Sequence, residues 1–206
     1  KLLKEISFSA NLTDTLEVWD LQLVRYGKSV IRERMHFVER LNGILKDIHS
    51  SLTGGKEEIQ IIYEPNVSEE MFEEELARNR ERDLHFRQSC IGPHRDDFRV
   101  SVNGIDIRRF GSQGQQRTAA LSLKLAEIRL VEQEVKDTPV LMLDDVLSEL
   151  DSSRQNYLLQ SIHNIQTLIT CTGLDDFISN RFRINRVFQV SDGTVTLKQN
   201  QQEESK

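Results

Sequence analysis

The sequence predicts an α/β protein with a helical arm over residues 1–90, an α/β part over residues 91–198 and a disordered tail over residues 199–206. The arm is predicted because apolar residues recur in steps of three and four between residues 16 and 48, the spacing of one helix face. The α/β part is predicted because two strand-like apolar runs flank a helical segment between residues 140 and 170. A strand, helix and strand in this order indicate a parallel sheet with a right-handed crossover.

Length and composition limit the class of protein. The chain has 206 residues, enough for one or two domains, and 37% of them are hydrophobic. No run approaches the roughly 18 apolar residues of a spanning helix and no signal peptide is found, so we expect a cytoplasmic protein without membrane contact. A formal net charge of -6 confines any DNA contact to a local patch. Cys90 and Cys171 are too isolated for a disulfide framework, and the start at Lys1 suggests a fragment of a longer protein.

The arm is predicted to begin with a long helix from Leu16 to Ile48. Its predicted buried face carries Leu16, Trp19, Leu23, Tyr26, Val30, Phe37, Leu41, Ile44 and Ile48. Gly27 and Gly43 lie inside this pattern and mark candidate positions for a bend or a break. A strand is expected over residues 58–63, and a second helix is expected from Ser68, a good N-cap, to about Arg87.

The α/β part is predicted to open with a hairpin. Asn103-Gly104 is a strong turn signal, so residues 98–102 and 105–107 should pair as strands. The next helix is expected from about Gln115 to Val135. It is apolar on much of its surface, which predicts that it is mostly buried.

The rest of the chain is predicted to form a crossover unit and a second hairpin. Residues 140–143 form a strand buried on both faces, residues 152–162 a helix, and residues 166–170 the next strand. Residues 186–190 and 194–197 flank Asp192-Gly193, which indicates a closing hairpin.

Two segments carry the chemistry of a nucleotide-binding protein. The segment Phe110–Arg117 opens a helix and offers backbone N–H groups and a hydroxyl, which attract phosphate. Asp144 and Asp145 follow a buried strand, and paired carboxylates there suit Mg²⁺ and water. The phosphate-binding loop G-x-x-x-x-G-K-[ST] is absent, because its best candidate has Ser50 in place of the first glycine and Glu57 in place of the hydroxyl residue.

Three ordered motifs resemble those of the RecF family, in the SMC-like branch of the ABC ATPases. They are Gly92–Asp97, Phe110–Arg117 and Leu143–Asp151, and the resemblance extends over almost the whole chain. It implies a fold composed of an ABC-type ATPase half-domain, with a parallel sheet, flanking helices and hairpins, plus a helical arm domain. The family's N-terminal segment with the phosphate loop is missing, so the chain resembles the C-terminal portion of such a protein.

The resemblance assigns a cofactor-binding role to Ser112, Gln113, Gly114 and Gln115, which match the ABC signature. In such proteins this helix N-terminus caps the γ-phosphate of ATP held by the opposite subunit. Gly114 would allow close approach of the backbone, and Ser112 would add a small donor. The alternative is a glycine turn with an ordinary helix cap, and the carboxylates downstream favour the functional interpretation.

The resemblance also assigns roles in the second half of the chain. Asp144 matches the Walker B carboxylate that holds Mg²⁺, and Asp145 matches the catalytic position that orients or deprotonates the attacking water. The alternative for this pair is two acids capping the next turn. Asp151 matches the loop that crosses the dimer interface, and it is also a candidate N-cap. The segment Thr170–Thr172 lies where many ABC ATPases carry a switch histidine. The absence of a histidine there puts γ-phosphate sensing by this strand in doubt, although Thr172 could donate a hydrogen bond to the cofactor.

Two charged regions leave alternatives open. His94, Arg95, Asp96 and Asp97 suit a metal site or an ion network that supports the signature loop, and the residues favour the network. Arginines and lysines of the arm suit a strip that tracks DNA phosphates, but interleaved glutamates favour a solvated surface with i,i+4 ion pairs. These basic residues are Arg25, Lys28, Arg32, Arg34, Arg78, Arg80, Arg82 and Arg87, with Arg181, Arg183 and Arg186 as a smaller alternative.

The resemblance implies an ATP-gated DNA-binding clamp subunit in DNA replication, recombinational repair and the SOS response to DNA damage. The cofactors would be ATP and Mg²⁺, and the partners single-stranded and gapped or junction duplex DNA, a second copy in an ATP-dependent homodimer, and the RecO and RecR proteins that help load RecA. It would act in the cytoplasm at the nucleoid. The intact protein would be a weak DNA-dependent ATPase, whereas this chain should hydrolyse ATP poorly.

Two alternative functions remain. One is a nucleotide-independent protein-interaction module, in which the arm docks partner proteins. The other is an SMC-type chromosome-structural ATPase, which needs arms of hundreds of residues, whereas this arm has roughly seventy. The length of the arm argues against the second alternative.

Overall fold

The computed structural model describes residues 3–4, 15–172 and 184–198. The predicted disordered tail and the arginines at positions 181 and 183 lie outside these residues. Internal contacts divide the chain into two units, Lys1–Pro139 and Val140–Lys206. Within the part of the chain that is described, no helix combines the length and the apolar character required to cross a membrane.

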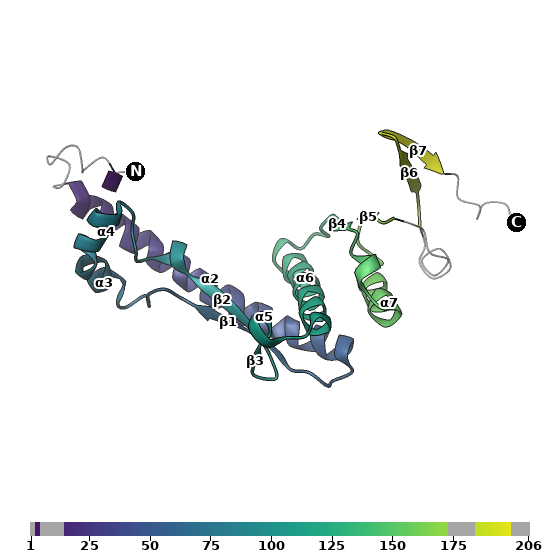
Figure 1. The fold of residues 1–206 in the computed structure, drawn as a ribbon, viewed down its shortest axis with the longest axis horizontal. Helices are drawn as coiled ribbons and strands as arrows, with labels where there is room; N and C mark the ends of the chain where they lie inside the picture. Colours follow the sequence, from purple (N-terminus) through teal and green to yellow (C-terminus); the bar gives the residue numbers. More distant parts are fainter. Residues whose placement is uncertain (1–2, 5–14, 173–183, 199–206) are drawn as a thin grey trace, which may run out of the picture. The chain divides into compact units, whose positions relative to one another are not determined.

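The first unit is built along one long helix, α2 (Leu16–Thr53). α2 continues through both Gly27 and Gly43, so the helix does not break at either glycine. It ends at Gly54, whose φ of 64° is the left-handed conformation that glycine adopts without steric cost. Beside α2 lies an antiparallel sheet of β1 (Ile59–Glu64), β2 (Asp97–Val102) and β3 (Ile105–Asp106), in the order β1, β2, β3 (Figure 1).

The buried face of α2 agrees with the predicted one only in part, since Leu16 and Leu41 are buried and Leu23, Ile44 and Ile48 pack against the cores. The buried residues are Leu16, Val24, Gly27, Ile31, Leu41, Leu45 and His49. Trp19, Tyr26 and Phe37, predicted to be buried, are instead exposed by 57%, 62% and 43%. Near Gly27 the ring of Phe72 packs against the helix so closely that a Cβ at this position would lie 2.2 Å from Phe72 Cε1.

The second arm helix is two short helices rather than one. α3 (Phe72–Arg78) and α4 (Arg80–Phe86) meet at Asn79, whose side-chain amide donates to the carbonyl of Glu75 at 2.9 Å. The backbone N–H of Asn79 donates to the same carbonyl at 3.1 Å, and the interruption lies at Asn79 itself, whose φ of -92° and ψ of 9° depart from helical values. The first of the two helices also begins four residues later than the predicted N-cap, Ser68.

The predicted hairpin forms, but its second strand is short. Asn103 and Gly104 both have positive φ at the turn, as the sequence predicts. β3 ends because Asp106 accepts a hydrogen bond from the Arg108 N–H at 2.9 Å and caps a short helix, α5 (Ile107–Phe110). Val102 of β2 pairs with Ile105 of β3 next to the turn.

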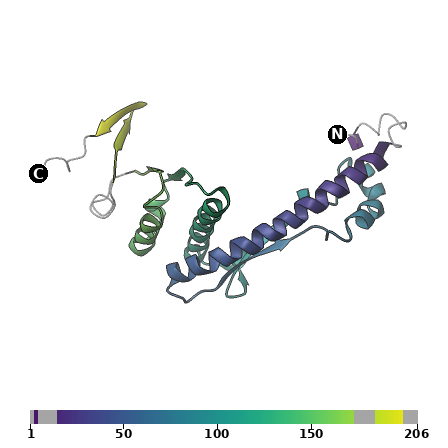
Figure 2. The same cartoon turned by 180° about the vertical axis from the view of Figure 1, so that it is seen from behind.

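Helix α6 (Gln113–Val135) follows and covers the C-terminal part of α2, as the view from behind also shows (Figure 2). Its buried face is lined by Thr118, Ala119, Leu121, Ser122, Leu125, Ala126 and Leu130. Val131 and Val135 are exposed, so α6 buries one face and is not mostly buried as expected. The core that it closes consists of Leu41, Leu45, Ile59, Ile61, Val102, Ile107, Ala119, Ala126 and Leu130.

The second unit contains the predicted crossover. β4 (Leu141–Asp144) and β5 (Thr167–Thr170) are parallel, and α7 (Ser152–Ser161) lies between them in sequence, after a short helix, η3 (Leu147–Glu149). The expectation that β4 is buried on both faces is wrong, since the side chain of Met142 is 77% exposed. Among the described residues β4 pairs with β5 alone.

The chain closes with a hairpin of β6 (Val187–Ser191) and β7 (Thr194–Lys198) around Asp192 and Gly193. The mixture of helices with parallel and antiparallel strands confirms the predicted α/β class. β1 and β2 pair although they lie on opposite sides of residue 90, so one sheet spans the predicted domain boundary. A division into independent domains at residue 90 stays a prediction.

Candidate functional site

The N-terminus of α6 is fixed by a reciprocal capping box. Ser112 Oγ accepts a hydrogen bond from the Gln115 N–H at 3.2 Å, and Gln115 Oε1 accepts one from the Ser112 N–H at 3.1 Å. The N–H groups of Gln113 and Gly114 belong to the first helical turn, where no preceding turn provides a carbonyl acceptor. Together with the positive end of the helix dipole, they form an arrangement that suits a phosphate group.

The two glycines of this segment have different structural roles. A Cβ at Gly111 would lie 2.6 Å from the carbonyl oxygen of Ile107, so internal packing requires a glycine there. A Cβ at Gly114 would meet only Ser112 Oγ, at 3.9 Å, which is an ordinary contact. The packing of the described residues does not require glycine at position 114. A ligand that approaches the backbone closely would require glycine there, because glycine has no side chain.

The two predicted carboxylates follow β4 directly. Asp144 is in register with Thr170 on β5, and Thr170 Oγ1 donates a hydrogen bond to Asp144 Oδ1, which orients that carboxylate. Asp145 has a φ of 52° in the left-handed region, and its N–H donates to the carbonyl of Thr170 at 3.1 Å. Both aspartates are exposed at the end of a parallel strand, where α/β proteins commonly bind ligands.

The described residues contain no group of three or more His, Cys, Asp or Glu side chains placed to hold a metal ion. A single carboxylate such as that of Asp144 can still hold Mg²⁺ together with waters and phosphate oxygens. Hard oxygen ligands of this kind fit the ion, so the chemistry of the strand end agrees with the predicted role.

Asp151 caps α7. Its Oδ1 accepts hydrogen bonds from the N–H groups of Ser153 and Arg154, both at 3.1 Å. The pKa of Asp151 is lowered from its ordinary value, first by the backbone hydrogen bond from Arg154 and further by the positive charge of the Arg154 side chain. The N-cap role is therefore observed, whereas a role at a dimer interface stays a prediction.

Thr172 lies two residues beyond the end of β5 and is exposed. The hydroxyl that contacts the Asp144 carboxylate belongs to Thr170, which sequence reasoning did not single out. Its position was available in principle, because parallel strands of this unit place the last residue of one beside the last residue of the other. The predicted site residues thus fall into two groups, Ser112–Gln115 in the first unit and the remainder in the second.

The charged cluster before β2 is a network of ion pairs and hydrogen bonds. The Asp96 side chain is only 3% exposed and lies 2.7 Å from Arg34 Nη1, while its other oxygen accepts from the Asn66 N–H at 2.9 Å. Tyr63 also donates to Asp96, and burial together with this hydrogen bond raises the pKa of Tyr63 to about 12. The partners of Asp96 lie on α2, on β1 and after β1, so this part of the network joins parts of the arm. Asp97 lies 3.6 Å from Arg108 Nη1 in α5, the short helix that leads into the segment Phe110–Arg117.

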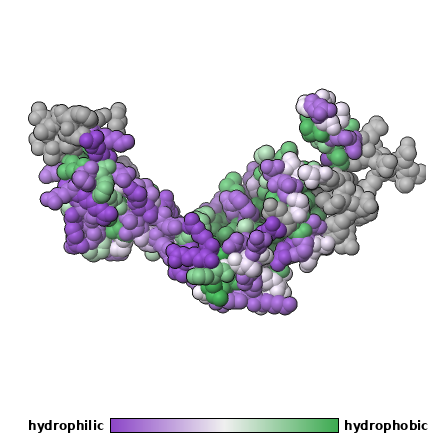
Figure 3. All heavy atoms as spheres, in the orientation of Figure 1, coloured by the Kyte–Doolittle hydropathy of each residue, from purple (hydrophilic) through white to green (hydrophobic). Residues whose placement is uncertain are grey.

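Most arginines on the arm have acidic partners. Arg78 pairs with Glu74 and Glu75 along one helix, and longer-range pairs are Arg32 with Glu69 and Arg80 with Asp20. The surface over α3 and α4 is mainly hydrophilic (Figure 3). These contacts confirm the interpretation of a solvated, ion-paired helix surface at these arginines.

Comparison with known proteins identifies the relatives of this chain. No family model matches it. It is 56% identical over 195 residues to the "DNA replication and repair protein RecF" of Agathobacter rectalis, and 44% identical over 188 residues to that of Clostridium perfringens. These alignments cover 95% and 88% of this chain but 54% and 52% of the relatives, so the chain spans about half the length of the curated relatives it matches.

Solved structures give the same result. The recombination mediator protein RecF-ATP in the RecFOR pathway is 35% identical, with a TM-score of 0.82 over 96% of this chain and 54% of the solved one. The corresponding RecF-ATPrS structure has a TM-score of 0.80 over 95% of this chain and 54% of the solved one. The sequence and the fold agree, and this chain belongs to the RecF family of DNA replication and repair proteins.

Proposed function

We propose that the segment Ser112–Gln115 caps the γ-phosphate of an ATP molecule held by a second copy of the protein. The observation that carries this proposal is the capped N-terminus of α6, a 23-residue helix, with Ser112 as its N-cap and Gly114 open to the close approach of a ligand. The Ser112 hydroxyl accepts from the Gln115 N–H, so its own hydrogen remains to be donated to a phosphate oxygen. Solved relatives are described with ATP, which supports a nucleotide ligand.

The second unit would supply the remaining groups of the nucleotide site. Asp144, oriented by Thr170, would hold Mg²⁺ through an oxygen ligand, and the ion would neutralise charge on the phosphates. Asp145 would orient the attacking water and accept its proton. Asp151 would lie at the dimer interface while capping α7, and Thr172 would donate a hydrogen bond near the γ-phosphate.

At the level of the whole protein, we propose an ATP-gated clamp on DNA. Two copies would close on DNA when each signature segment completes the partner's ATP site, and slow, DNA-dependent hydrolysis would reopen them. The DNA would be a gap or a junction of single and double strands, with RecO and RecR as partners in loading RecA in the cytoplasm at the nucleoid. The names of the relatives and the RecFOR pathway named for the solved structures support this role.

The first test is the variant Ser112→Arg in the full-length protein, meaning this chain extended to the length of its relatives. An arginine at the helix N-terminus would fill the space for the γ-phosphate. We expect the wild type to dimerise with ATP and the variant to bind ATP but remain monomeric in analytical ultracentrifugation. Equal dimerisation of both proteins, or no response of either to ATP, would favour a nucleotide-independent interaction module instead.

A further inference from the structure

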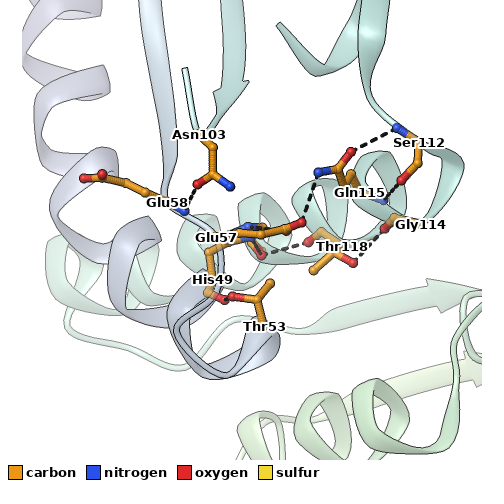
Figure 4. Close-up of polar contacts among 10 residues, drawn as sticks. His49, Thr53, Glu57, Glu58, Asn103, Ser112, Gly114, Gln115 and Thr118 are labelled. Atoms are coloured by element: carbon orange, nitrogen blue, oxygen red, sulfur yellow. Dashed lines mark hydrogen bonds and ion pairs between the residues drawn. The ribbon is translucent and has the colours of Figure 1, made fainter. Parts of the chain in front are cut away.

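A chain of polar contacts connects the end of the long helix α2 with the signature segment. Gln115 Nε2 donates a hydrogen bond to Glu57 Oε1 at 3.0 Å, and Glu57 Oε2 lies 3.3 Å from His49 Nε2. His49 is fully buried at 0% exposure, on the inward face of α2. Figure 4 shows Glu57 between His49 and Gln115, with the side chain of Glu58 directed away from them.

The other side of His49 leads back to the same signature helix. His49 Nδ1 lies 2.8 Å from Ser122 Oγ, and Ser122 Oγ donates to the carbonyl of Thr118 at 2.8 Å. Thr118 Oγ1 in turn donates to the carbonyl of Gly114 at 2.7 Å. The contacts therefore close a ring through α6 that includes two residues of the signature segment, Gly114 and Gln115.

The chemistry of these groups determines which of them donate and which accept hydrogen bonds. A carboxylate only accepts hydrogen bonds, so Glu57 faces the NH₂ end of the Gln115 side chain and leaves its carbonyl end for the Ser112 N–H. Ser122 Oγ, the donor to the Thr118 carbonyl, also lies 2.8 Å from His49 Nδ1. The contact between His49 Nε2 and the Glu57 carboxylate requires a proton on Nε2, because a carboxylate only accepts hydrogen bonds. The side of His49 that carries Nε2 faces the Glu57 carboxylate.

We infer that Glu57 and His49 are positioning residues for the signature segment. Glu57 holds the Gln115 amide in the one orientation that completes the capping box with Ser112, and buried His49 holds the Glu57 carboxylate in place. Burial makes such a network rigid, because the low local dielectric strengthens its contacts and makes an unpaired member costly. Through this ring, the end of the arm helix α2 holds the Gln115 side chain that accepts from the Ser112 backbone N–H. The identity of the ligand at Ser112 rests on the proposed function. The contacts that position the segment do not depend on that ligand, because they all lie within this chain.

Hydrogen exchange measured by mass spectrometry on the peptide Phe110–Arg117 of the full-length protein tests the positioning. Glu57→Ala removes the acceptor for Gln115 and should accelerate exchange of this peptide roughly tenfold, the effect of losing one charge-assisted hydrogen bond. Glu57→Gln keeps an acceptor oxygen and should restore most of the protection. Glu58→Ala is the matched control, because the Glu58 side chain pairs with Lys46 outside the ring, and it should leave exchange unchanged.

The positioning role is overturned if Glu57→Ala exchanges at the wild-type rate, or if Glu58→Ala accelerates exchange equally. His49→Leu should accelerate the same peptide, and the double variant His49→Leu/Glu57→Ala should exchange no faster than Glu57→Ala. An additive effect would overturn the contribution of His49. If His49→Leu does not fold, the Glu57 series decides alone.

ATP-dependent dimerisation of the same variants separates this inference from the proposed function. Faster exchange in Glu57→Ala together with weaker dimerisation supports both. Faster exchange with unchanged dimerisation supports the positioning role and overturns the assignment of this segment to a partner's ATP.

Discussion

At the scale of single residues, the starts of two helices are fixed by capping side chains. Ser112 and Asp151 both cap a helix, and both belong to motifs that the family resemblance assigns to the nucleotide site. Both caps are observed in the structure, whereas contacts with a nucleotide or a partner copy stay predictions. A capping residue holds its own backbone in place, so the geometry that the ligand would meet is set before the ligand arrives.

Asp151→Ala should destabilise the chain by about 1 kcal/mol at neutral pH, the typical effect of losing an N-cap. The folded-state pKa of Asp151 lies below its ordinary value of 3.8, so its contribution is present above that pH and is lost as the pH falls through the lowered pKa. The difference in urea-unfolding free energy between wild type and variant should therefore shrink below about pH 4. Asp151→Ser keeps a capping side chain that does not titrate in this range. The prediction would be contradicted if Asp151→Ala lost the same unfolding free energy at every pH and Asp151→Ser lost an equal amount.

At the scale of elements, α2 organises the first unit, and its two interior glycines differ in their surroundings. Gly27 faces Phe72, and an added Cβ would lie 2.2 Å from Phe72 Cε1. Gly43 is exposed, and nothing lies within 4 Å of an added Cβ. The same substitution at these positions should therefore have opposite effects.

Gly27→Ala should destabilise the chain by roughly 1–3 kcal/mol, because the new methyl group overpacks the contact of α2 with Phe72. Gly43→Ala should stabilise it by about 0.5–1 kcal/mol, because alanine has the higher helix propensity and meets no neighbour. Urea unfolding of the two variants beside the wild type measures both signs. Equal effects of the two substitutions would mean that Phe72 does not pack on Gly27 in solution.

At the scale of the whole molecule, the first unit contains a complete core of its own. The buried residues that connect α2, the three-stranded sheet and α6 all lie before Pro139. The ring around His49 also lies entirely within this unit. The signature segment therefore acquires its local geometry without the strand that carries Asp144.

A chain truncated after residue 139 should consequently fold by itself. We expect it to keep the helical circular dichroism signal of α2 and α6, to unfold cooperatively in urea, and to protect the peptide Phe110–Arg117 from hydrogen exchange as the longer chain does. Residues 140–206 added in trans should not change this protection. A truncated chain without cooperative unfolding would show that the first unit depends on the second.

Several elements of the structure and the family of the chain could be predicted from the sequence alone. The capped start of α6, the Asn103–Gly104 turn and the crossover from β4 through α7 to β5 follow from the spacing of neighbouring residues. Such signals are local, so one chain is enough to detect them. The resemblance carried by the three motifs agrees with the relatives found by comparison.

The sequence by itself determined the class of fold, the family and the segments that bear the candidate site, because those depend on residue types at short spacing. Only the tertiary structure decided which face of α2 is buried, where the second arm helix breaks, and that Glu57 holds Gln115 across 58 positions of sequence. Periodicity shows that a helix has an apolar face but not which of two apolar faces meets a neighbour. That choice depends on the fit of distant side chains, here Phe72 against Gly27 and His49 against Ser122.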